Sequence, residues 1–281
     1  MRTITYKSIV ESVKNLCIQA ASNLPADIIA ALQKALQDEE SPEGKAILRQ
    51  CLDNANIAAC GNDPICQDTG IAIYFVELGA DVSVTGGTLI DAINEGTRQG
   101  YTEGYLRKSM VADPLFDRKN IGDNTPALIH CEVTAGDVLR ITLLPKGGGA
   151  ENMSALAMLK PAVGAAGVVD FVSETVINAG GRPCPPVIVG VGIGGAADTA
   201  MHLAKRALLR SVWEPHPDPR YATLEADILA RINASGIGPQ GLGGRITALA
   251  VHIEERPCHL ASLPVAVNIN CHAARRAEVT I

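Results

Sequence analysis

The feature that most constrains this chain is a change in hydrophobic pattern near residue 61. Before it, apolar residues recur at spacings of three and four, as in ITYKSIVESVKNLCIQAASNL, and this spacing predicts helices across residues 3–60. Pro25 and Pro42 are placed to begin the second and third of them. Beyond it, short β-branched runs separated by glycine predict strands at 71–79, 126–133 and 138–145. Helical and strand periods in one chain indicate a mixed α/β protein.

The later segments continue this alternation. We expect helices at 89–106, 198–210 and 219–235, two short helices meeting near Pro161 within 153–180, and strands at 185–193, 247–253 and 263–270. No internal repeat or low-complexity linker divides the chain, so a single domain over residues 1–281 is the simplest organisation. In this interpretation a helical N-terminal layer (1–60) packs on a mixed-sheet core (61–281) flanked by helices.

The composition excludes several classes of protein. Hydrophobic residues make up 47% of the chain but aromatic residues only 3%, so the core must be built from Ala, Val, Ile and Leu. The net charge of −6, without a basic run, argues against nucleic acid as a partner. The N-terminus has no continuous apolar run, and no stretch of about 18 apolar residues follows. We therefore expect a soluble, cytoplasmic protein with no membrane partner.

The eight cysteines, without a secretory signal, are better explained as thiols or metal ligands than as disulfides. Cysteines within regular elements are expected to be buried as small hydrophobes, whereas those in polar turns can bind an ion. The first group comprises Cys17, Cys51 and Cys131. The second comprises Cys66, Cys184 and Cys271, in NDPICQDTG, GGRPCPPV and VNINCHAARR. Cys60 and Cys258, also near loops, are weaker alternatives.

The three loop cysteines are separated by 118 and 87 residues. Structural zinc sites usually use closely spaced pairs, and ferredoxins use a dense cysteine run. Three thiolates from distant loops would instead suit a [4Fe–4S] cluster with one iron open, and an open iron is a Lewis acid that can bind a carboxylate and a hydroxyl. From spacing alone, the alternative is three unligated loop cysteines.

The residues around these loops favour a site for a small anion. Gln67 and Asp68 place an amide and a carboxyl group directly after Cys66, although DTG can also simply cap a turn. Arg107 could bind a carboxylate through two hydrogen bonds, or be a solvated surface group. The glycine-rich KGGGAEN (146–152) is expected to open a helix at Asn152 or Ser154, where backbone N–H groups could bind an anion.

A second glycine motif suggests a different function but lacks the rest of its pattern. GVGIGG (190–195) satisfies the G-x-G-x-x-G spacing of dinucleotide-binding proteins. The acidic residue expected at the end of a second strand is missing, since LLRSVWEPHPDPR contains proline clusters instead. These glycines are expected instead to allow close packing around the Cys184 loop.

Six motifs together carry a resemblance to a known family: ICQDTG (65–70), LRKS (106–109), KGGGAEN (146–152), CPPVIVGVGIGG (184–195), GIGPQGLGG (236–244) and HLASLPVAVNINCHAARR (259–276). They resemble the N-terminal, cluster-binding region of class I fumarases. The same region forms the alpha subunit of two-subunit fumarases and L-tartrate dehydratases. The motifs occur in the family's order and cover nearly all of the chain beyond residue 61.

The resemblance implies that Cys66, Cys184 and Cys271 hold a [4Fe–4S] cluster with one open iron. It implies that Asp68 is the catalytic residue and helps to protonate a departing hydroxyl. The contacts with a small dicarboxylate substrate that it implies are Gln67, Asp68, Arg107, Gly149, Asn152, Met153, Ser154 and His259.

The resemblance also implies a reaction and a partner. The reaction is reversible hydration of fumarate to (S)-malate, a step of the tricarboxylic acid cycle, with L-tartrate and mesaconate as alternative substrates. KGGGAEN and GVGIGG are more similar to the fumarase branch than to the tartrate branch. Single-chain relatives continue into a second domain, so we expect a separate beta subunit that supplies the base, in an α2β2 assembly. A non-catalytic iron–sulfur protein and a nicotinamide-dependent oxidoreductase are the remaining alternatives.

Overall fold

A computed structural model describes all residues 1–281 and resolves two compact units. The first unit comprises Met1–Pro25, Asn54–Gly148 and Arg275–Ile281, and the second comprises Ala26–Asp53 and Gly149–Ala274. The predicted mixed α/β class is confirmed, and the helices expected before residue 61 are present but divided between the two units. A single domain over residues 1–281 stays a prediction, since two compact units can belong to one domain.

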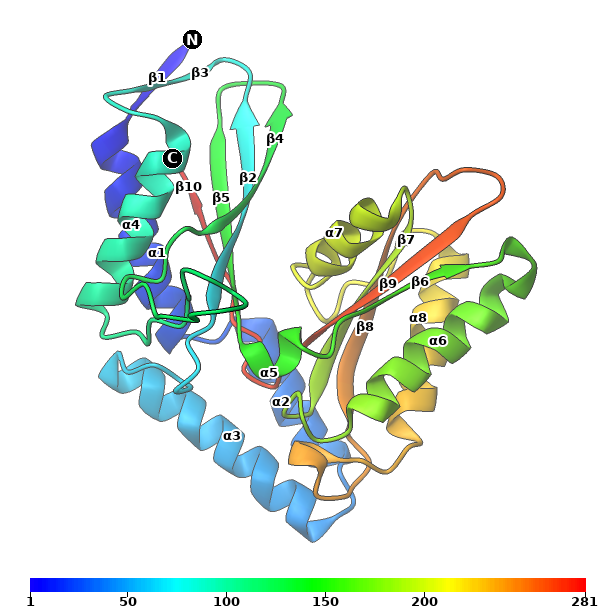
Figure 1. Cartoon of the computed structure of the whole chain (residues 1–281). Helices are drawn as coiled ribbons and strands as arrows, with labels where there is room; N and C mark the ends of the chain where they lie inside the picture. Colours follow the sequence, from blue (N-terminus) through cyan, green and yellow to red (C-terminus); the bar gives the residue numbers. More distant parts are fainter. The chain divides into compact units, whose positions relative to one another are not determined.

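The first unit is built on a four-stranded sheet. Its elements are β1 (Arg2–Thr5), α1 (Tyr6–Ser22), β2 (Ile71–Gly79), β3 (Val82–Thr85), α4 (Leu89–Glu103), β4 (Leu128–Thr134), β5 (Leu139–Lys146) and β10 (Ala277–Thr280). The strand order is β10-β5-β2-β4, in which β2 runs parallel to β4 and antiparallel to β5 (Figure 1). Helices α1 and α4 pack against each other, and β1 pairs with β3 beside them.

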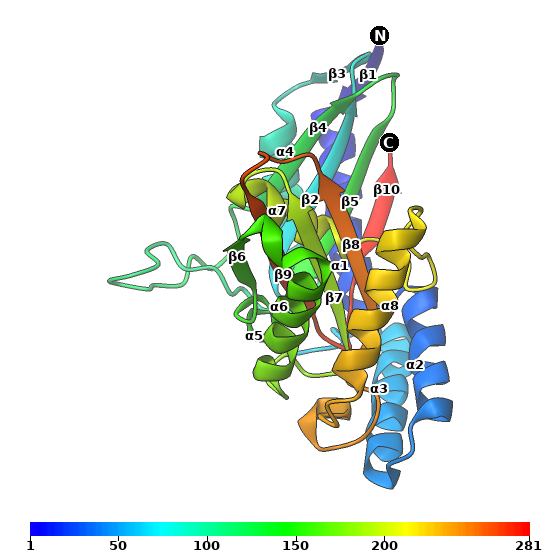
Figure 2. The ribbon, with the colours of Figure 1, turned by 90° about the vertical axis from the view of Figure 1, so that its right-hand side faces the viewer.

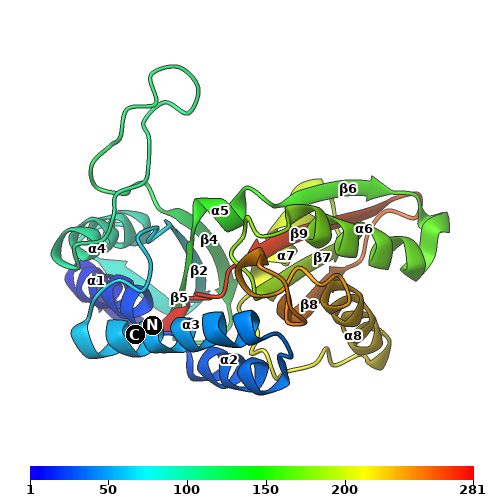
Figure 3. The ribbon, with the colours of Figure 1, turned by 90° about the horizontal axis from the view of Figure 1, so that it is seen from below.

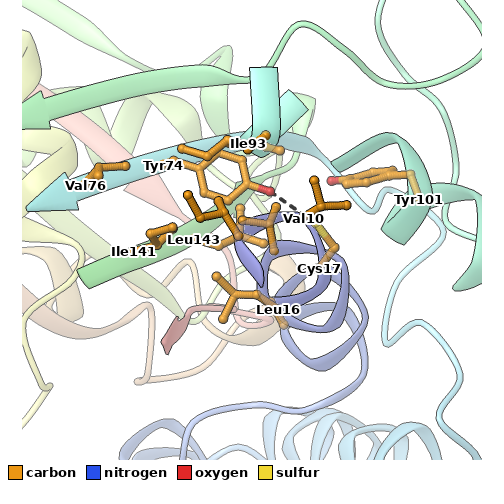
Figure 4. Packing of buried hydrophobic residues seen from close by; sticks show 14 of the residues in the cluster. Val10, Leu16, Cys17, Tyr74, Val76, Ile93, Tyr101, Ile141 and Leu143 are labelled. Atoms are coloured by element: carbon orange, nitrogen blue, oxygen red, sulfur yellow. Dashed lines mark hydrogen bonds between the residues drawn. The ribbon is translucent and has the colours of Figure 1, made fainter. Parts of the chain in front are cut away.

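Tyr74 lies at the centre of the core of this unit and joins α1 to α4 (Figure 4). Its hydroxyl group is 3.2 Å from Sγ of Cys17 and 2.8 Å from Oγ1 of Thr97, so the buried polar atoms satisfy one another. Burial raises the pKa of the Cys17 thiol to about 12. The prediction that Cys17 is a core residue is therefore confirmed.

The second unit has its own four-stranded sheet, with the order β6-β9-β7-β8. Its strands are β6 (Ala155–Leu159), β7 (Val187–Gly194), β8 (Ala248–Arg256) and β9 (Leu263–Asn270). Its helices are α2 (Ala26–Asp38), α6 (Gly164–Ala179), α7 (Ala197–Ala207) and α8 (Pro219–Asn233), with short turns at Pro161–Val163 and Pro239–Gly241. Two helices, α3 (Pro42–Gly61) and α5 (Gly148–Glu151), begin in one unit and end in the other. Helix α7 covers one face of the sheet, and α6 and α8 cover the other (Figure 1).

The glycines of GVGIGG serve packing in this sheet. A Cβ atom added at Gly190 or Gly192 would lie 2.0 Å from a backbone oxygen of α7, at Ala204 or Ala200 respectively. The backbone of α7 therefore rests directly on β7, which no larger residue would allow. Close packing was the predicted role of these glycines, but their neighbour is α7 rather than the Cys184 loop.

One helical segment, Pro161–Ala179, is long and apolar enough to cross a membrane by its length and composition. One face of this segment is buried in the core of the second unit, through Val168, Val172 and Val176. The packing of α6 thus accounts for these three valines.

Three predictions about local structure were wrong. The first of the two helices expected within 153–180 is strand β6, because the run ALAML pairs antiparallel with β9, and pairing decides between a short helix and a strand. No helix opens at Asn152 or Ser154, which instead follow the short helix α5. Cys131 is exposed, because β4 is the edge strand of its sheet, whereas Cys51 is buried as predicted.

Glu39 connects the helical and sheet parts of the second unit. Its side chain is buried, and its carboxylate accepts the backbone N–H groups of Glu40, Ser41, Arg245 and Ile246 at 2.8 to 2.9 Å. Burial raises the pKa of this carboxyl group, but the four N–H donors together outweigh burial, and the pKa is lowered from 4.5.

Glu39→Gln should lower the free energy of unfolding by about 2 to 3 kcal/mol at pH 7, because the charged acceptor of four buried donors is lost. Since the folded-state pKa lies below the unfolded value of 4.5, the stabilisation is complete above that pH and is lost as the pH falls through the folded pKa. Urea unfolding between pH 7 and pH 3 measures both effects. The control Glu40→Gln removes a carboxylate whose side chain is 75% exposed and should change little. Equal effects of the two variants would contradict the role of Glu39.

Candidate functional site

Residues 66–70, here called the Cys66–Gly70 loop, lead into β2 and carry the predicted catalytic residue. Oδ1 of Asp68 accepts the N–H of Gly70 at 3.1 Å, and Oδ2 accepts the N–H of Gly148 at 2.8 Å. A Cβ atom added at Gly147 would lie only 3.0 Å from Oδ2, so a side chain there would crowd the carboxylate. Gly70 of the loop itself and Gly148 of the glycine-rich segment thus hold the Asp68 carboxylate in one orientation from two sides.

Two buried side chains donate hydrogen bonds to the backbone of this loop. The hydroxyl group of Tyr101 donates to the backbone oxygen of Gly70 at 3.0 Å, and Nδ2 of Asn124 donates to the same oxygen at 3.2 Å. Oδ1 of Asn124 in turn accepts the N–H of Ser109 at 2.7 Å. Burial raises the pKa of Tyr101 well above its ordinary value of 10.0, so its hydroxyl group stays a donor. The backbone of the loop is therefore fixed by groups that sequence patterns did not single out.

Arg107 is placed through the same loop. Oγ1 of Thr69, which is buried, donates to the backbone oxygen of Arg107 at 2.9 Å, while the Arg107 side chain is exposed. Arg107 begins a segment, residues 107–127, that projects from the rest of the first unit before β4 (Figure 2, Figure 3). The first unit therefore brings Cys66, Gln67, Asp68 and Arg107 onto one connected loop system, with Sγ of Cys66 3.6 Å from Oε1 of Gln67.

In the second unit, Cys184 and Cys271 lie on two loops that are bonded to each other. The N–H of His272 donates to the backbone oxygen of Cys184 at 3.1 Å. The side-chain amide of Gln240 donates to the oxygen of Pro185 at 2.9 Å and lies 3.1 Å from Nδ1 of His272. Cys184 has a φ of 56°, which is uncommon for a residue other than glycine and recurs at functional sites. The GIGPQGLGG motif thus connects the two predicted ligand loops through Gln240.

Cys51 lies near this pair without having been a candidate. Burial first, and then the neighbouring charges of Cys271 and Cys184, together raise the pKa of its thiol to about 11. A thiol held in this protonated state is a poor metal ligand. Its predicted role as a core residue is consistent with this environment.

The predicted substrate contacts of the second unit lie at the same end of its sheet. A Cβ atom added at Gly149 would lie 3.3 Å from the backbone oxygen of Arg182, in the turn before Cys184. Nδ2 of Asn268 donates to Oγ of Ser154 at 2.7 Å and to Oε2 of Glu151 at 3.1 Å, and Lys205 pairs with the same glutamate. Asn152, which is exposed, and Met153 lie between these contacts. Asn268 therefore anchors the segment 149–154 to β9, the strand that Cys271 directly follows.

His259 does not join this group. It precedes β9, whereas Cys271 follows β9, and Leu263 and Asn270 at the ends of that strand are about 24 Å apart at about 3.4 Å per residue. His259 lines a separate cavity of about 630 Å³ with Arg220, Tyr221 and Leu263. His259 therefore lies at the opposite end of β9 from Cys271, and its contact with the substrate stays a prediction.

The predicted site residues fall into two groups, one in each unit. The first unit holds Cys66, Gln67, Asp68 and Arg107, and the second holds Gly149, Asn152, Met153, Ser154, Cys184 and Cys271. No group of three or more His, Cys, Asp and Glu side chains converges as a metal site. The three-cysteine ligand set therefore stays a prediction.

Sequence reasoning missed the residues that hold the loops: Tyr101, Asn124, Glu151, Lys205, Gln240, Asn268 and Arg275. Each is a polar residue inside an element or turn whose partner is distant in the sequence. One local signal was the polar pair in VNIN, since Asn268 and Asn270 are unusual in a strand that is otherwise fully apolar. Glu151, Gln240 and Arg275 also lie within three of the six family motifs, which did not reveal what these residues contact.

Comparisons with known proteins agree on one family. A family model described as "Fumarate hydratase (Fumerase)" matches residues 10–280. A protein of Methanocaldococcus jannaschii, whose name assigns it provisionally to the L(+)-tartrate dehydratase alpha subunits, is 45% identical over 274 residues, which covers 96% of each chain. The L(+)-tartrate dehydratase subunit alpha of Escherichia coli strain K12 is 33% identical over 277 residues, covering 97% of this chain and 90% of that protein.

Proposed function

This chain belongs to the fumarate hydratase (Fumerase) family, and from that premise we propose that it is the alpha subunit of an iron–sulfur hydro-lyase that reversibly hydrates fumarate to (S)-malate. The observation that carries this proposal is the Asp68 carboxylate, which two backbone N–H groups hold two residues after Cys66. A proton-transfer group on the loop of a predicted metal ligand suits the removal or addition of water.

The cofactor that we propose is a [4Fe–4S] cluster with one open iron, held by Cys66, Cys184 and Cys271. Two features of the chain fit such a group. The thiols of Cys184 and Cys271 come from loops bonded to each other, and thiolates are the ligands that iron–sulfur clusters require. The guanidinium group of Arg275 is buried next to the Cys66–Gly70 loop without a counter-ion, which fits an anion bound there. When bound, the cluster supplies a Lewis acid for a carboxylate and a hydroxyl group.

The side chains of this chain would then bind the dicarboxylate and move one proton. Arg107 and Gln67 would orient carboxylate groups, and the exposed Asn152 with Gly149, Met153 and Ser154 would line the second unit's part of the site. Asp68 would donate a proton to the oxygen of the departing hydroxyl group in the dehydration direction. The proton on the adjacent carbon would be removed by a base of the partner subunit.

The partner that we propose is a beta subunit in an α2β2 assembly, because the relatives in the comparison are named alpha subunits. A cytoplasmic location and a role in the tricarboxylic acid cycle accompany this function as predictions. L-tartrate is the second candidate substrate, and the names of the same relatives favour it.

After anaerobic reconstitution, the full chain should contain about four irons and matching sulfide, and Cys184→Ser should lose them. The control Cys258→Ser changes an exposed thiol that lies 3.3 Å from the backbone oxygen of Ser262, and this variant should load the cluster normally. Iron and sulfide analysis measures the content, and paramagnetic resonance of the reduced protein, with and without fumarate, tests for an open iron. A wild-type chain that assembles no cluster would contradict the proposed cofactor.

Asp68→Asn should keep the cluster and reduce turnover by about 10²-fold or more, because it removes a proton-transfer group. The assay uses the chain together with its beta subunit and follows fumarate hydration. Asp63→Asn is the matched control, since Asp63 is exposed and lies in the same connection. Near-wild-type turnover in Asp68→Asn would remove this residue from the mechanism.

Substrate preference is decided by kcat/KM of the assembled enzyme for fumarate, (S)-malate, L-tartrate and mesaconate. We expect fumarate and malate to exceed the others by about tenfold or more, since differences of about 1.4 kcal/mol in transition-state binding suffice for this. A preference for L-tartrate would replace the fumarate proposal with the second candidate.

A further inference from the structure

Arg275 has the largest of the fully buried side chains in this protein, with 2% of its surface exposed. It is the first residue of the chain's return to the first unit, four positions after Cys271. One nitrogen, Nη2, donates to the backbone oxygen of Asp68 at 2.8 Å. The guanidinium group therefore contacts the Cys66–Gly70 loop from inside the first unit.

The rest of this guanidinium group is unpaired. Nε and Nη1 are buried and have no hydrogen-bond acceptor, and no carboxylate lies within ion-pair distance of the side chain. A buried charge without a partner costs several kcal/mol, so folded proteins rarely tolerate one. The positive charge is therefore expected to be offset by a negative group that the chain itself does not provide.

The surroundings of Arg275 support a bound anion rather than a missing internal partner. The polar groups that share the loop with it are the Tyr101 hydroxyl and the Asn124 amide, both neutral, and both already donate to Gly70. The Asp68 carboxylate is held by the backbone N–H groups of Gly70 and Gly148 and makes no ion pair with Arg275. The positive charge of the guanidinium group is therefore neutralised neither by these two neutral groups nor by the Asp68 carboxylate.

We propose that Arg275 is a positioning residue that holds the Cys66–Gly70 loop through the Asp68 backbone and supplies the positive charge that offsets the anion bound at this loop. The inference rests on the proposed function, in which the anion is the thiolate-held cluster with its dicarboxylate. Three thiolates outweigh the charge of the cluster core, and a dicarboxylate adds further negative charge. A fixed cation in a dry environment stabilises such charge and raises the reduction potential of the cluster.

Two variants separate the two parts of the proposal. Arg275→Gln removes the charge and the guanidinium donors, whereas Arg275→Lys keeps the charge and loses the planar geometry. The matched control, Arg140→Gln, removes one positive charge from the same unit at a side chain that is 43% exposed. All variants are made in the full chain, and amide exchange in β2 checks that the first unit is folded.

The first measurement is amide hydrogen exchange of residues 65–70 in the cluster-free chain. Arg275→Gln should speed exchange there about tenfold or more, because a hydrogen bond from a charged donor to the loop backbone is lost. In Arg275→Lys, residues 65–70 should exchange at a rate between those of the wild type and Arg275→Gln. In Arg140→Gln, their exchange rate should equal that of the wild type. Unchanged exchange in Arg275→Gln would overturn the anchoring role.

The second measurement is the reduction potential of the reconstituted cluster. Arg275→Gln should lower the potential relative to the wild type, whereas Arg275→Lys should restore most of it and Arg140→Gln should leave it unchanged. Equal potentials in wild type and Arg275→Gln would overturn the charge role, since a purely structural residue would not act on the potential through its charge.

The two measurements also distinguish this inference from the proposed function. Exchange in the cluster-free chain depends only on the loop and on Arg275, so it decides the anchoring role whether or not a cluster forms. A wild-type chain without a cluster would overturn the proposed cofactor and the charge role together, and would leave the exchange result standing.

Discussion

The hydrogen bonds that buried side chains donate to the backbone of residues 68–70 are the constraint on which the first unit's part of the site depends. Tyr101 and Asn124 hold the Gly70 oxygen, and Arg275 holds the Asp68 oxygen. These donors come from a helix, a projecting segment and the C-terminal return of the chain. A loop held by three side chains from such distant parts of the sequence can present Asp68 and Cys66 in one orientation, as preorganised sites require.

In the second unit, the order and direction of the strands in its sheet position the predicted site residues. Its strand β9 is antiparallel to both β6 and β7, so the end of β9 meets the start of each neighbour. Cys271 follows the end of β9, and Ser154 and Cys184 precede the starts of β6 and β7. The three residues therefore lie at the same end of the sheet. The same geometry separates His259 from them, because it belongs to the opposite end of β9. At this end of the sheet, the side chain of Asn268 donates a hydrogen bond to Ser154 and so connects β9 to the segment 149–154.

Charge is distributed differently in the two units. The second unit pairs its buried ionic groups within itself, as Arg210 does with Glu225 and Glu39 does with backbone N–H groups. The first unit leaves the buried guanidinium group of Arg275 without a counter-ion. Unpaired buried charge is costly for folding alone, and such groups concentrate where a protein binds an oppositely charged ligand.

Local patterns in the sequence determined most of the secondary structure and the family. The helices before residue 61, β2 and the strands β7 to β9 follow from hydrophobic period and β-branched composition, which are properties of neighbouring residues. The six motifs identified the family, because they record residue types at fixed spacing. The same patterns mistook β6 for a helix, since five apolar residues suit either structure.

Only the tertiary structure decided which residues hold the site and which residues meet. Tyr101, Asn124, Gln240 and Arg275 act through partners that are about 30 or more residues away, and no local period records such pairs. Cys131 is exposed because β4 has a neighbour on one side only, and His259 is distant from Cys271 because a whole strand lies between them. Sequence patterns depend on the neighbours of a residue along the chain. Strand order and long-range hydrogen bonds determine its neighbours in space.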